Sequence, residues 1–322
     1  MPGQFRASAQ LTIGMEHNVD LHWIEYETID DGTIALITLN RPRQRNAQSR
    51  GLLVELDEAF SAANADDNVR VVVLRGAGTS FSAGHDLGSR EHLAEKLPGP
   101  SQHPTYQQFG GTRSGVERMW GQERHFYLEK TKQWREIQKV TIASVQGPVY
   151  AAGLMLMWAC DLIVADSTAT FADVVGTRLG MCGVEYFAHP WELGFRRAKD
   201  LLLTGDSLSV DEAYRIGMVS RVFEPDQLVD STIAYARRIA ELPSVASTLI
   251  KNQVNEAQDA QGFNQALSSA FMLHQLNHAH WQMLSGGEVT VQTEQFGGRA
   301  RAEQPPIVPT SKSQVRADDP VA

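Results

Sequence analysis

Two glycine-containing turns in this sequence are suited to binding an anionic oxygen through backbone N–H groups. The first is the run FSAGHDL at residues 81–87, which follows an apolar segment and the loose turn GAG at 76–78. The second is QGP at 146–148, which leads into AAG at 151–153, where small residues begin a predicted helix. Glycine lets N–H groups point toward a ligand, and the first N–H groups of a helix have no partner within it. Two such donors that converge on one carbonyl oxygen would form an oxyanion hole.

Two histidines near the C-terminal end have the spacing of metal ligands. His274 and His278 are four residues apart on a predicted helix, and His280 follows closely. The pair lacks the glutamate of an HExxH motif, and the sequence indicates no third ligand. We therefore interpret the histidines as a polar helix face at a subunit contact, and we predict no metal site.

The elements that must position the two turns are predicted by the pattern of apolar residues. Residues 33–39 and 69–74 are continuous apolar runs typical of buried strands, whereas residues 52–63 place their apolar side chains on one helical face. The same order returns as a strand over 140–145, a helix over 151–159 and a strand over 162–165. This alternation predicts an α/β fold with a largely parallel sheet over a core of residues 21–225.

The remaining segments are predicted to be an insert, a helical part and two tails. Residues 88–115 are rich in proline and glycine, which favours a loop over the core. Residues 226–285 have a helical pattern that is interrupted at Pro243 and Gly262. Residues 1–20 are weakly patterned and predict a weakly ordered extension, and residues 286–322 predict a polar tail.

Composition excludes several classes of function. The 29 Lys and Arg residues against 38 Asp and Glu residues give a formal net charge of −9, which does not suit nucleic-acid binding. Residues 140–160 carry no charge and would be long enough to cross a bilayer, but QGP interrupts them, so a strand, a turn and a short helix are favoured. Cys160 and Cys182 cannot form a disulfide framework, and the first ten residues lack the apolar stretch of a secretory signal. We expect a cytoplasmic protein.

Several segments together resemble the crotonase superfamily, also called the enoyl-CoA hydratase/isomerase family, over residues 34–284. They are TLNRP at 38–42, RNA at 45–47, FSAGHDL at 81–87, VQGPVYAAG at 145–153, ACDL at 159–162, Phe171 and LLLTGDSLSVDEAYRIGMV at 201–219. Their order and spacing make the resemblance specific. It implies a crotonase-like spiral of ββα units, a C-terminal helical trimerisation subdomain, and a site for a coenzyme A thioester with no cofactor beyond the coenzyme A moiety.

The resemblance also implies roles for residues of both turns. The family's two oxyanion donors correspond to the backbone N–H groups of His85 and Ala152, and Ala152 stands where relatives usually have glycine. Arg41 and Arg45 are expected to contact the phosphates or adenine ring of coenzyme A, and Asp86 is also expected to cap the turn that follows it. Further contacts with the ligand are expected from Ala47, Ala83, His85, Asp86, Leu87 and Gly153.

The two catalytic glutamates of the family's simple hydratases are missing from this sequence. In those enzymes one carboxylate holds water as a base while the other donates a proton. Met155 takes the first position here. Gly176 takes the second, or Val175 if the alignment gap near Asp173 is placed differently. These side chains cannot exchange a proton, so hydration by the usual pair is not expected.

Other residues then become candidates for the acid/base. Glu185 is the first, because it lies in the segment where dehalogenases and naphthoate synthases of the family place an active aspartate. Asp173 is the second, because it lies beside the lost glutamate position. The His85 ring could also transfer a proton near neutral pH. We interpret His189 as a residue at a helix start and Tyr186 as a buried structural tyrosine.

The sequence thus predicts an enoyl-CoA hydratase/isomerase-like enzyme, a lyase or isomerase of fatty acid metabolism that acts through a stabilised thioester enolate. One alternative is an acyl-CoA hydrolase, dehalogenase or decarboxylase that uses Glu185 or Asp173. Another alternative is a protein that binds acyl-CoA without catalysis. The apolar faces of the helices in residues 226–284 predict a homotrimer or hexamer.

Overall fold

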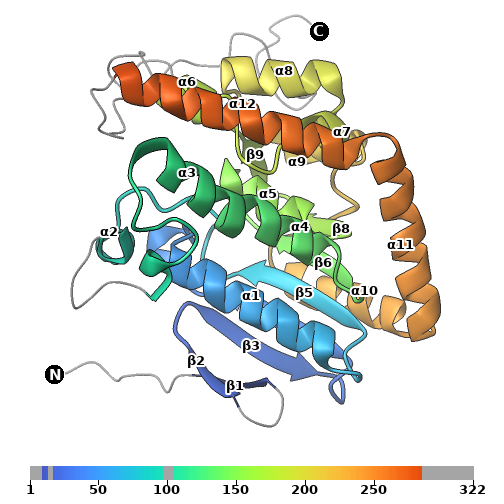
Figure 1. Cartoon of the computed structure of the whole chain (residues 1–322). Helices are drawn as coiled ribbons and strands as arrows, with labels where there is room; N and C mark the ends of the chain where they lie inside the picture. The colour runs from blue at the N-terminus through green and yellow to red at the C-terminus, as the bar shows by residue number, and fades with distance from the viewer. Residues whose placement is uncertain (1–8, 14–16, 97–103, 285–322) are drawn as a thin grey trace, which may run out of the picture.

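A six-stranded sheet forms the centre of the protein (Figure 1). The computed structural model describes residues 9–13, 17–96 and 104–284. The strand order is β11-β8-β6-β5-β4-β3. The strands are β3 (Ile24–Ile29), β4 (Ile34–Leu39), β5 (Val71–Gly76), β6 (Val140–Val145), β8 (Leu162–Asp166) and β11 (Arg221–Phe223). Only β3 pairs in the antiparallel direction, with β4, and the other neighbours are parallel. The prediction of a largely parallel sheet is confirmed.

Both faces of this sheet are covered, which explains why its strands are continuous apolar runs. All six residues of β4 are buried, and successive side chains point to opposite faces. Ile37 lies in the core cluster that includes residues of α1 (Arg50–Ala65). Ile34 lies in a second cluster with residues of α10 (Leu228–Ala240). The sheet therefore forms a middle layer between these helices.

The uncharged stretch at residues 140–160 folds as a strand, a turn and a short helix, as predicted. It comprises β6, β7 (Pro148–Tyr150) and α5 (Ala152–Trp158). β7 belongs to a three-stranded sheet with β9 (Thr170–Ala172) and β10 (Leu208–Ser209). The turn before β7 requires glycine, because Gly147 has φ +58° and a Cβ there would lie 2.1 Å from the carbonyl oxygen of Thr79. Within the described residues, no helix has the length and apolar character to cross a membrane.

The insert at residues 88–115 contains more regular structure than the predicted loop. It includes α2 (Arg90–Lys96) and a 3-10 turn (Pro104–Gln107), whereas residues 97–103 lie outside the described part. A helical segment that the sequence analysis did not predict follows directly: α3 (Gly115–Glu123), a π-helical stretch (Arg124–Glu129) and α4 (Lys130–Arg135). The wider π turn changes which side chains face the core, and such turns are frequent at functional sites.

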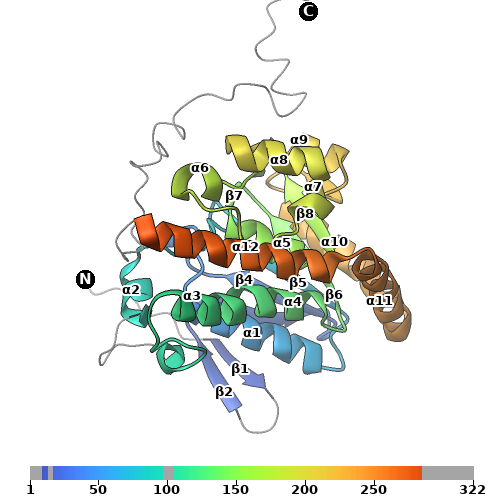
Figure 2. The same ribbon diagram turned by 45° about the horizontal axis from the view of Figure 1, so that its top comes forward.

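The C-terminal part is helical and is interrupted at the predicted residues. It consists of α10, α11 (Ser244–Ala260) and α12 (Phe263–Leu284), with Pro243 and Gly262 between them. In both views α12 runs alongside α3, which makes it one wall of the region above the sheet (Figures 1 and 2). Four shorter helices precede this part: α6 (Val175–Leu179), α7 (His189–Leu193), α8 (Phe195–Thr204) and α9 (Val210–Arg215).

Two short strands lie in the N-terminal extension. β1 (Ala9–Ile13) and β2 (His17–Leu21) form an antiparallel pair, although no element was predicted within residues 1–20. Each strand has only five residues of mixed polarity, which gives no clear alternation. The predicted polar tail at 286–322 lies outside the described residues.

Candidate active site

The turn at residues 81–87 follows β5 in the chain, and backbone hydrogen bonds hold it in place. The N–H groups of this turn that donate to other backbone carbonyls are those of Phe81, Ala83 and Asp86, at 2.9 to 3.0 Å. The carbonyl of Gly84 accepts from the N–H of Gln48 at 2.8 Å. Among the described residues, the N–H of His85 has no acceptor. It is therefore free to bind a ligand.

The N-terminus of α5 lies directly against this turn. Ala152 is the first residue of α5, and its N–H also has no acceptor in the described part of the chain. Ala151 before it has φ +49° and ψ −118°, a region that favours glycine. Gly84 has φ +88°, and a Cβ on it would lie 3.1 Å from the backbone nitrogen of Ala152 and 2.7 Å from the carbonyl oxygen of Tyr150. The two predicted donors thus belong to segments in close contact, and this contact requires glycine at position 84.

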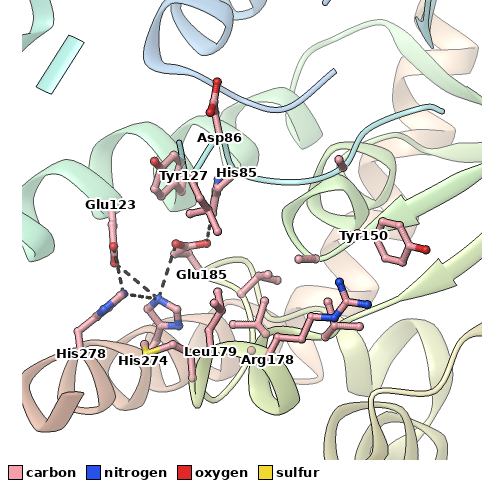
Figure 3. Close-up of a pocket in the computed structure, with 18 of the residues that line it drawn as sticks. His85, Asp86, Glu123, Tyr127, Tyr150, Arg178, Leu179, Glu185, His274 and His278 are labelled. Carbon is pink, nitrogen blue, oxygen red and sulfur yellow. Dashed lines mark hydrogen bonds and ion pairs between the residues drawn. The ribbon is translucent and has the colours of Figure 1, made fainter. Parts of the chain in front are cut away.

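A cavity of about 540 Å³ opens beside these segments (Figure 3). In the figure the glutamates and most of the histidines gather on one side, whereas Arg178 and Tyr150 lie on the other. The lining residues are Arg45, Ala83, His85, Asp86, Leu87, His92, Met119, Glu123, Tyr127, Tyr150, Ala151, Val174, Val175, Arg178, Leu179, Met181, Gly183, Val184, Glu185, His274, His278 and Trp281.

Glu185 and His85 form a hydrogen-bonded pair in this cavity. Glu185 is 3% exposed, and its Oε2 lies 2.9 Å from Nε2 of His85. The ring of Tyr127 packs on the His85 ring, with 3.8 Å between the centroids. Burial raises the pKa of Glu185, but the charge and hydrogen bond of His85, together with the charge of His274, outweigh burial and hold this pKa below its usual value. Glu185 is therefore an ionised carboxylate at neutral pH, suited to accept a proton.

His274 and His278 line the cavity. Their Nε2 atoms lie 3.0 Å apart. Glu123 of α3 joins them, with Oε1 3.1 Å from Nε2 of His278 and Oε2 3.6 Å from Nε2 of His274. Glu123 and Tyr127 were not predicted as site residues, because nothing local in the sequence shows that α3 packs along α12.

The charges of this cluster shift the pKa values of its members. Burial raises the pKa of Glu123, but hydrogen bonds from His274 and His278 outweigh burial and lower it. Burial alone would lower the pKa of His274. Contacts with Cys182 and Glu123, together with the charge of Glu185, outweigh that effect and raise the pKa of His274 well above its usual value. The cavity thus holds two buried carboxylates that need neighbouring positive charge.

Asp173, the second candidate acid/base, is not part of the cavity wall. Its Oδ2 lies 3.0 Å from Nε2 of His189, and both side chains are fully buried. Its Oδ1 accepts a hydrogen bond from the N–H of Val175 at the start of α6. Tyr186 is likewise buried outside the wall, edge-on to Phe263. This placement suits Asp173 to a structural role.

The residues that the resemblance places at the two glutamate positions carry no carboxylate. Met155 is buried in the core and is not part of the cavity wall. Val175 lines the cavity, and Gly176 does not. Either placement of the gap therefore leaves an apolar residue at the second position.

Arg41 is corrected from a coenzyme A contact to a residue of an internal ion pair. Its side chain is fully buried, and Nη1 lies 2.8 Å from Oδ2 of Asp86 and donates to the carbonyl of Ala47. Asp86 also caps the following turn as predicted, because its Oδ1 accepts from the N–H groups of Gly88 and Ser89. A guanidinium held in this way is not available to a phosphate.

Of the other predicted ligand contacts, Arg45, Ala83, His85, Asp86 and Leu87 line the cavity. Arg45 is exposed and remains the candidate partner for a phosphate. Ala47 and Gly153 are not part of the wall. A Cβ on Gly153 would lie 2.4 Å from the carbonyl oxygen of Ser82, so packing between α5 and the turn requires this glycine.

Comparisons with known proteins agree with the resemblance. The family model described as enoyl-CoA hydratase/isomerase matches residues 30–288. The Mycobacterium tuberculosis protein EchA13, provisionally named as an enoyl-CoA hydratase, is 57% identical over 295 residues, which cover 92% of this chain and 93% of EchA13. A 4-chlorobenzoyl coenzyme A dehalogenase of an Arthrobacter species is 33% identical over 243 residues, which cover 75% of this chain and 80% of that enzyme.

A solved structure agrees as well. A crystal structure of a probable enoyl-CoA hydratase from Mycobacterium smegmatis superimposes with a TM-score of 0.72 at 41% sequence identity, covering 82% of this chain and 98% of that chain. The fold is thus shared with a relative of clear sequence similarity. The chain belongs to the enoyl-CoA hydratase/isomerase family, that is, to the crotonase superfamily.

Proposed function

We propose that this protein transforms an acyl-CoA or enoyl-CoA thioester through an enolate, with Glu185 as the acid/base. The observation that supports this most is that one cavity is lined by a buried carboxylate, Glu185, and by His85, whose backbone N–H is free. Ala152, whose N–H is also free, is not part of the wall itself but directly follows Ala151, which is. The N–H groups would bind the thioester oxygen, which becomes negative when the enolate forms. Glu185 would take the proton from the neighbouring carbon.

His85 would contribute in two ways. Its N–H would bind the oxyanion, and its ring holds the Glu185 carboxylate at 2.9 Å. A single carboxylate can return the proton to a different carbon, which is double-bond isomerisation. Hydration needs a further group that delivers water. Isomerisation is therefore the reaction that these residues can complete by themselves.

The shape of the cavity indicates where the parts of the thioester would lie. Apolar side chains of Leu179, Met181, Val184 and Trp281 line it, which suits an apolar acyl group. Arg45 is exposed at the same cavity and would contact a phosphate of coenzyme A. In this proposal the reaction uses no cofactor beyond the coenzyme A moiety of the thioester.

A second candidate reaction is displacement of a leaving group by Glu185 as a nucleophile. It is favoured by the similarity to a 4-chlorobenzoyl coenzyme A dehalogenase. The ionised state of Glu185 suits attack as well as proton transfer. This reaction would pass through an ester of Glu185, whereas isomerisation would not.

The proposal is tested by incubating the purified protein with a set of acyl-CoA and enoyl-CoA thioesters that includes 4-chlorobenzoyl-CoA. Products are separated by chromatography, because isomerisation does not change mass. Products of the other reactions are identified by mass spectrometry. Calorimetry with a thioether analogue measures binding separately. We expect saturable binding and turnover of at least one enoyl thioester. Binding without turnover would favour a non-catalytic acyl-CoA-binding protein, and failure to bind any thioester would contradict the proposal.

We also expect the functional unit to be a homotrimer or hexamer. α12 is apolar on two faces: Phe263 and Phe271 are buried within the subunit, whereas Leu273 and Leu276 are 61% and 66% exposed. A helix that is apolar on both sides is normally covered on both. Light scattering at micromolar concentration should therefore give the mass of three or six chains, and Leu276→Glu should shift it toward smaller species. A stable monomer of the unaltered protein would contradict this expectation.

A further inference from the structure

Three side chains from two distant helices converge on one point in the cavity. Glu123 ends α3, and His274 and His278 lie one turn apart on α12. Their nearest ligand atoms all lie within 4.8 Å of one another. Figure 3 shows both imidazole rings and the carboxylate pointing toward this common space, with Glu185 beside it.

The separations fit ligands arranged around a small metal ion. A tetrahedral zinc ion with bonds of about 2.0–2.1 Å places its ligand atoms about 3.3 Å apart. The two Nε2 atoms lie 3.0 Å apart. Oε1 of Glu123 lies 3.1 Å from Nε2 of His278, and Oε2 of Glu123 lies 3.6 Å from Nε2 of His274. Hydrogen bonds explain this arrangement less completely, because Nε2 carries either one proton or one lone pair, whereas Nε2 of His274 faces three partners.

Charge and hydrogen bonding favour the same interpretation. Glu123 and Glu185 are both buried, so two negative groups lie in one cavity, and a divalent cation at the histidines would balance them. The amide of Gln275 donates to Oε2 of Glu123 at 2.6 Å, and Gln275 is itself buried. This bond orients the carboxylate so that Oε1 faces His278, as hydrogen bonds around a metal site commonly do.

We propose that Glu123, His274 and His278 bind a divalent transition-metal ion of the Zn²⁺ type. Two imidazoles and one carboxylate are a donor set that suits zinc. The fourth position faces the cavity, where Oε1 of Glu185 lies 3.6 Å from Nε2 of His274 and would accept a hydrogen bond from a water on the ion. The inference goes beyond the proposed function, which uses no metal. It also revises our prediction from the sequence, in which the third ligand was missing.

The test measures metal binding directly and does not depend on turnover. The full-length protein is stripped with a chelator, dialysed and titrated with ZnCl₂ in a calorimeter, and Co²⁺ is then added as a probe whose visible spectrum reports tetrahedral coordination. We expect one ion per chain and a rise in melting temperature when Zn²⁺ is added. His278→Ala and the isosteric Glu123→Gln should each weaken Zn²⁺ binding at least about 100-fold, more than the loss of an outer hydrogen bond would.

His280→Ala is the matched control, because His280 lies on the same helix, is exposed and is outside the cluster. It should bind Zn²⁺ as the unaltered protein does. Circular dichroism of each variant shows whether it has folded, and Glu123→Gln retains the shape of the side chain in case His278→Ala does not fold. The proposal is overturned if the stripped protein takes up no stoichiometric Zn²⁺, or if folded Glu123→Gln binds it as tightly as the unaltered protein.

Discussion

Replacing Glu185 by glutamine is expected to lower kcat by about 10²–10⁴-fold while the affinity for the thioester changes little, because this is the usual contribution of general acid/base catalysis. Glutamine keeps the size of the side chain and can still hydrogen-bond Nε2 of His85, but it cannot accept a proton from carbon. The measurement is kcat and KM on the thioester that the screen identifies, with calorimetry on the thioether analogue for affinity.

Asp173→Asn is the matched control, since it makes the same chemical change at a buried carboxylate that also pairs with a histidine. Asp173 is not part of the cavity wall, so we expect lower stability and nearly unchanged kcat. Activity that survives Glu185→Gln but is lost in Asp173→Asn would reverse the two assignments. If both variants keep full activity, the ring of His85, which lines the cavity, becomes the candidate for proton transfer. An ester on Glu185, found by mass spectrometry of the protein after a single turnover, would favour displacement over proton transfer.

Those parts of the fold that depend on local pattern could be predicted from the sequence. The apolar runs of β4, β5 and β6 predict buried parallel strands because the sheet is covered on both faces. Pro243 and Gly262 interrupt the C-terminal helices through backbone effects that do not depend on the rest of the molecule. The β1–β2 pair was not predicted, because its short strands have no clear alternation.

The candidate site could be predicted only in part, for a related reason. The turn at 81–87 and the start of α5 have local signatures, and the resemblance supplied their roles. Arg41 was misassigned because its partner, Asp86, is distant in sequence and is brought close only by folding. Glu123 was missed because it meets the two histidines only when α3 packs along α12. Burial then sets the chemistry of these groups, and burial cannot be read from the type of residue.

The geometry of the two N–H donors gives a further prediction of large effect. Gly84→Ala is expected to lower kcat by about 10²-fold or more, which is the typical cost of losing one oxyanion donor. The new methyl group would lie 2.7 Å from the carbonyl oxygen of Tyr150 and 3.1 Å from the nitrogen of Ala152, so the turn and α5 must move apart. In our proposal the N–H groups of His85 and Ala152 bind the same thioester oxygen, and this movement would prevent that. The measurement is kcat on the same thioester, together with the free energy of unfolding.

Backbone strain must be separated from this effect, because Gly84 has φ +88° and alanine costs about 1 kcal/mol or more at such a position. Gly217→Ala provides the control. Gly217 has nearly the same φ, +86°, a Cβ there would have no atom within 4 Å, and the residue is not part of the cavity wall. We therefore expect Gly217→Ala to lose a similar amount of stability from strain alone and to keep its kcat. If the two variants lose equal stability and both keep kcat, the thioester oxygen is not bound between these two backbone segments. If only Gly84→Ala loses kcat, the loss results from the separation of the two donors, since strain is common to both variants.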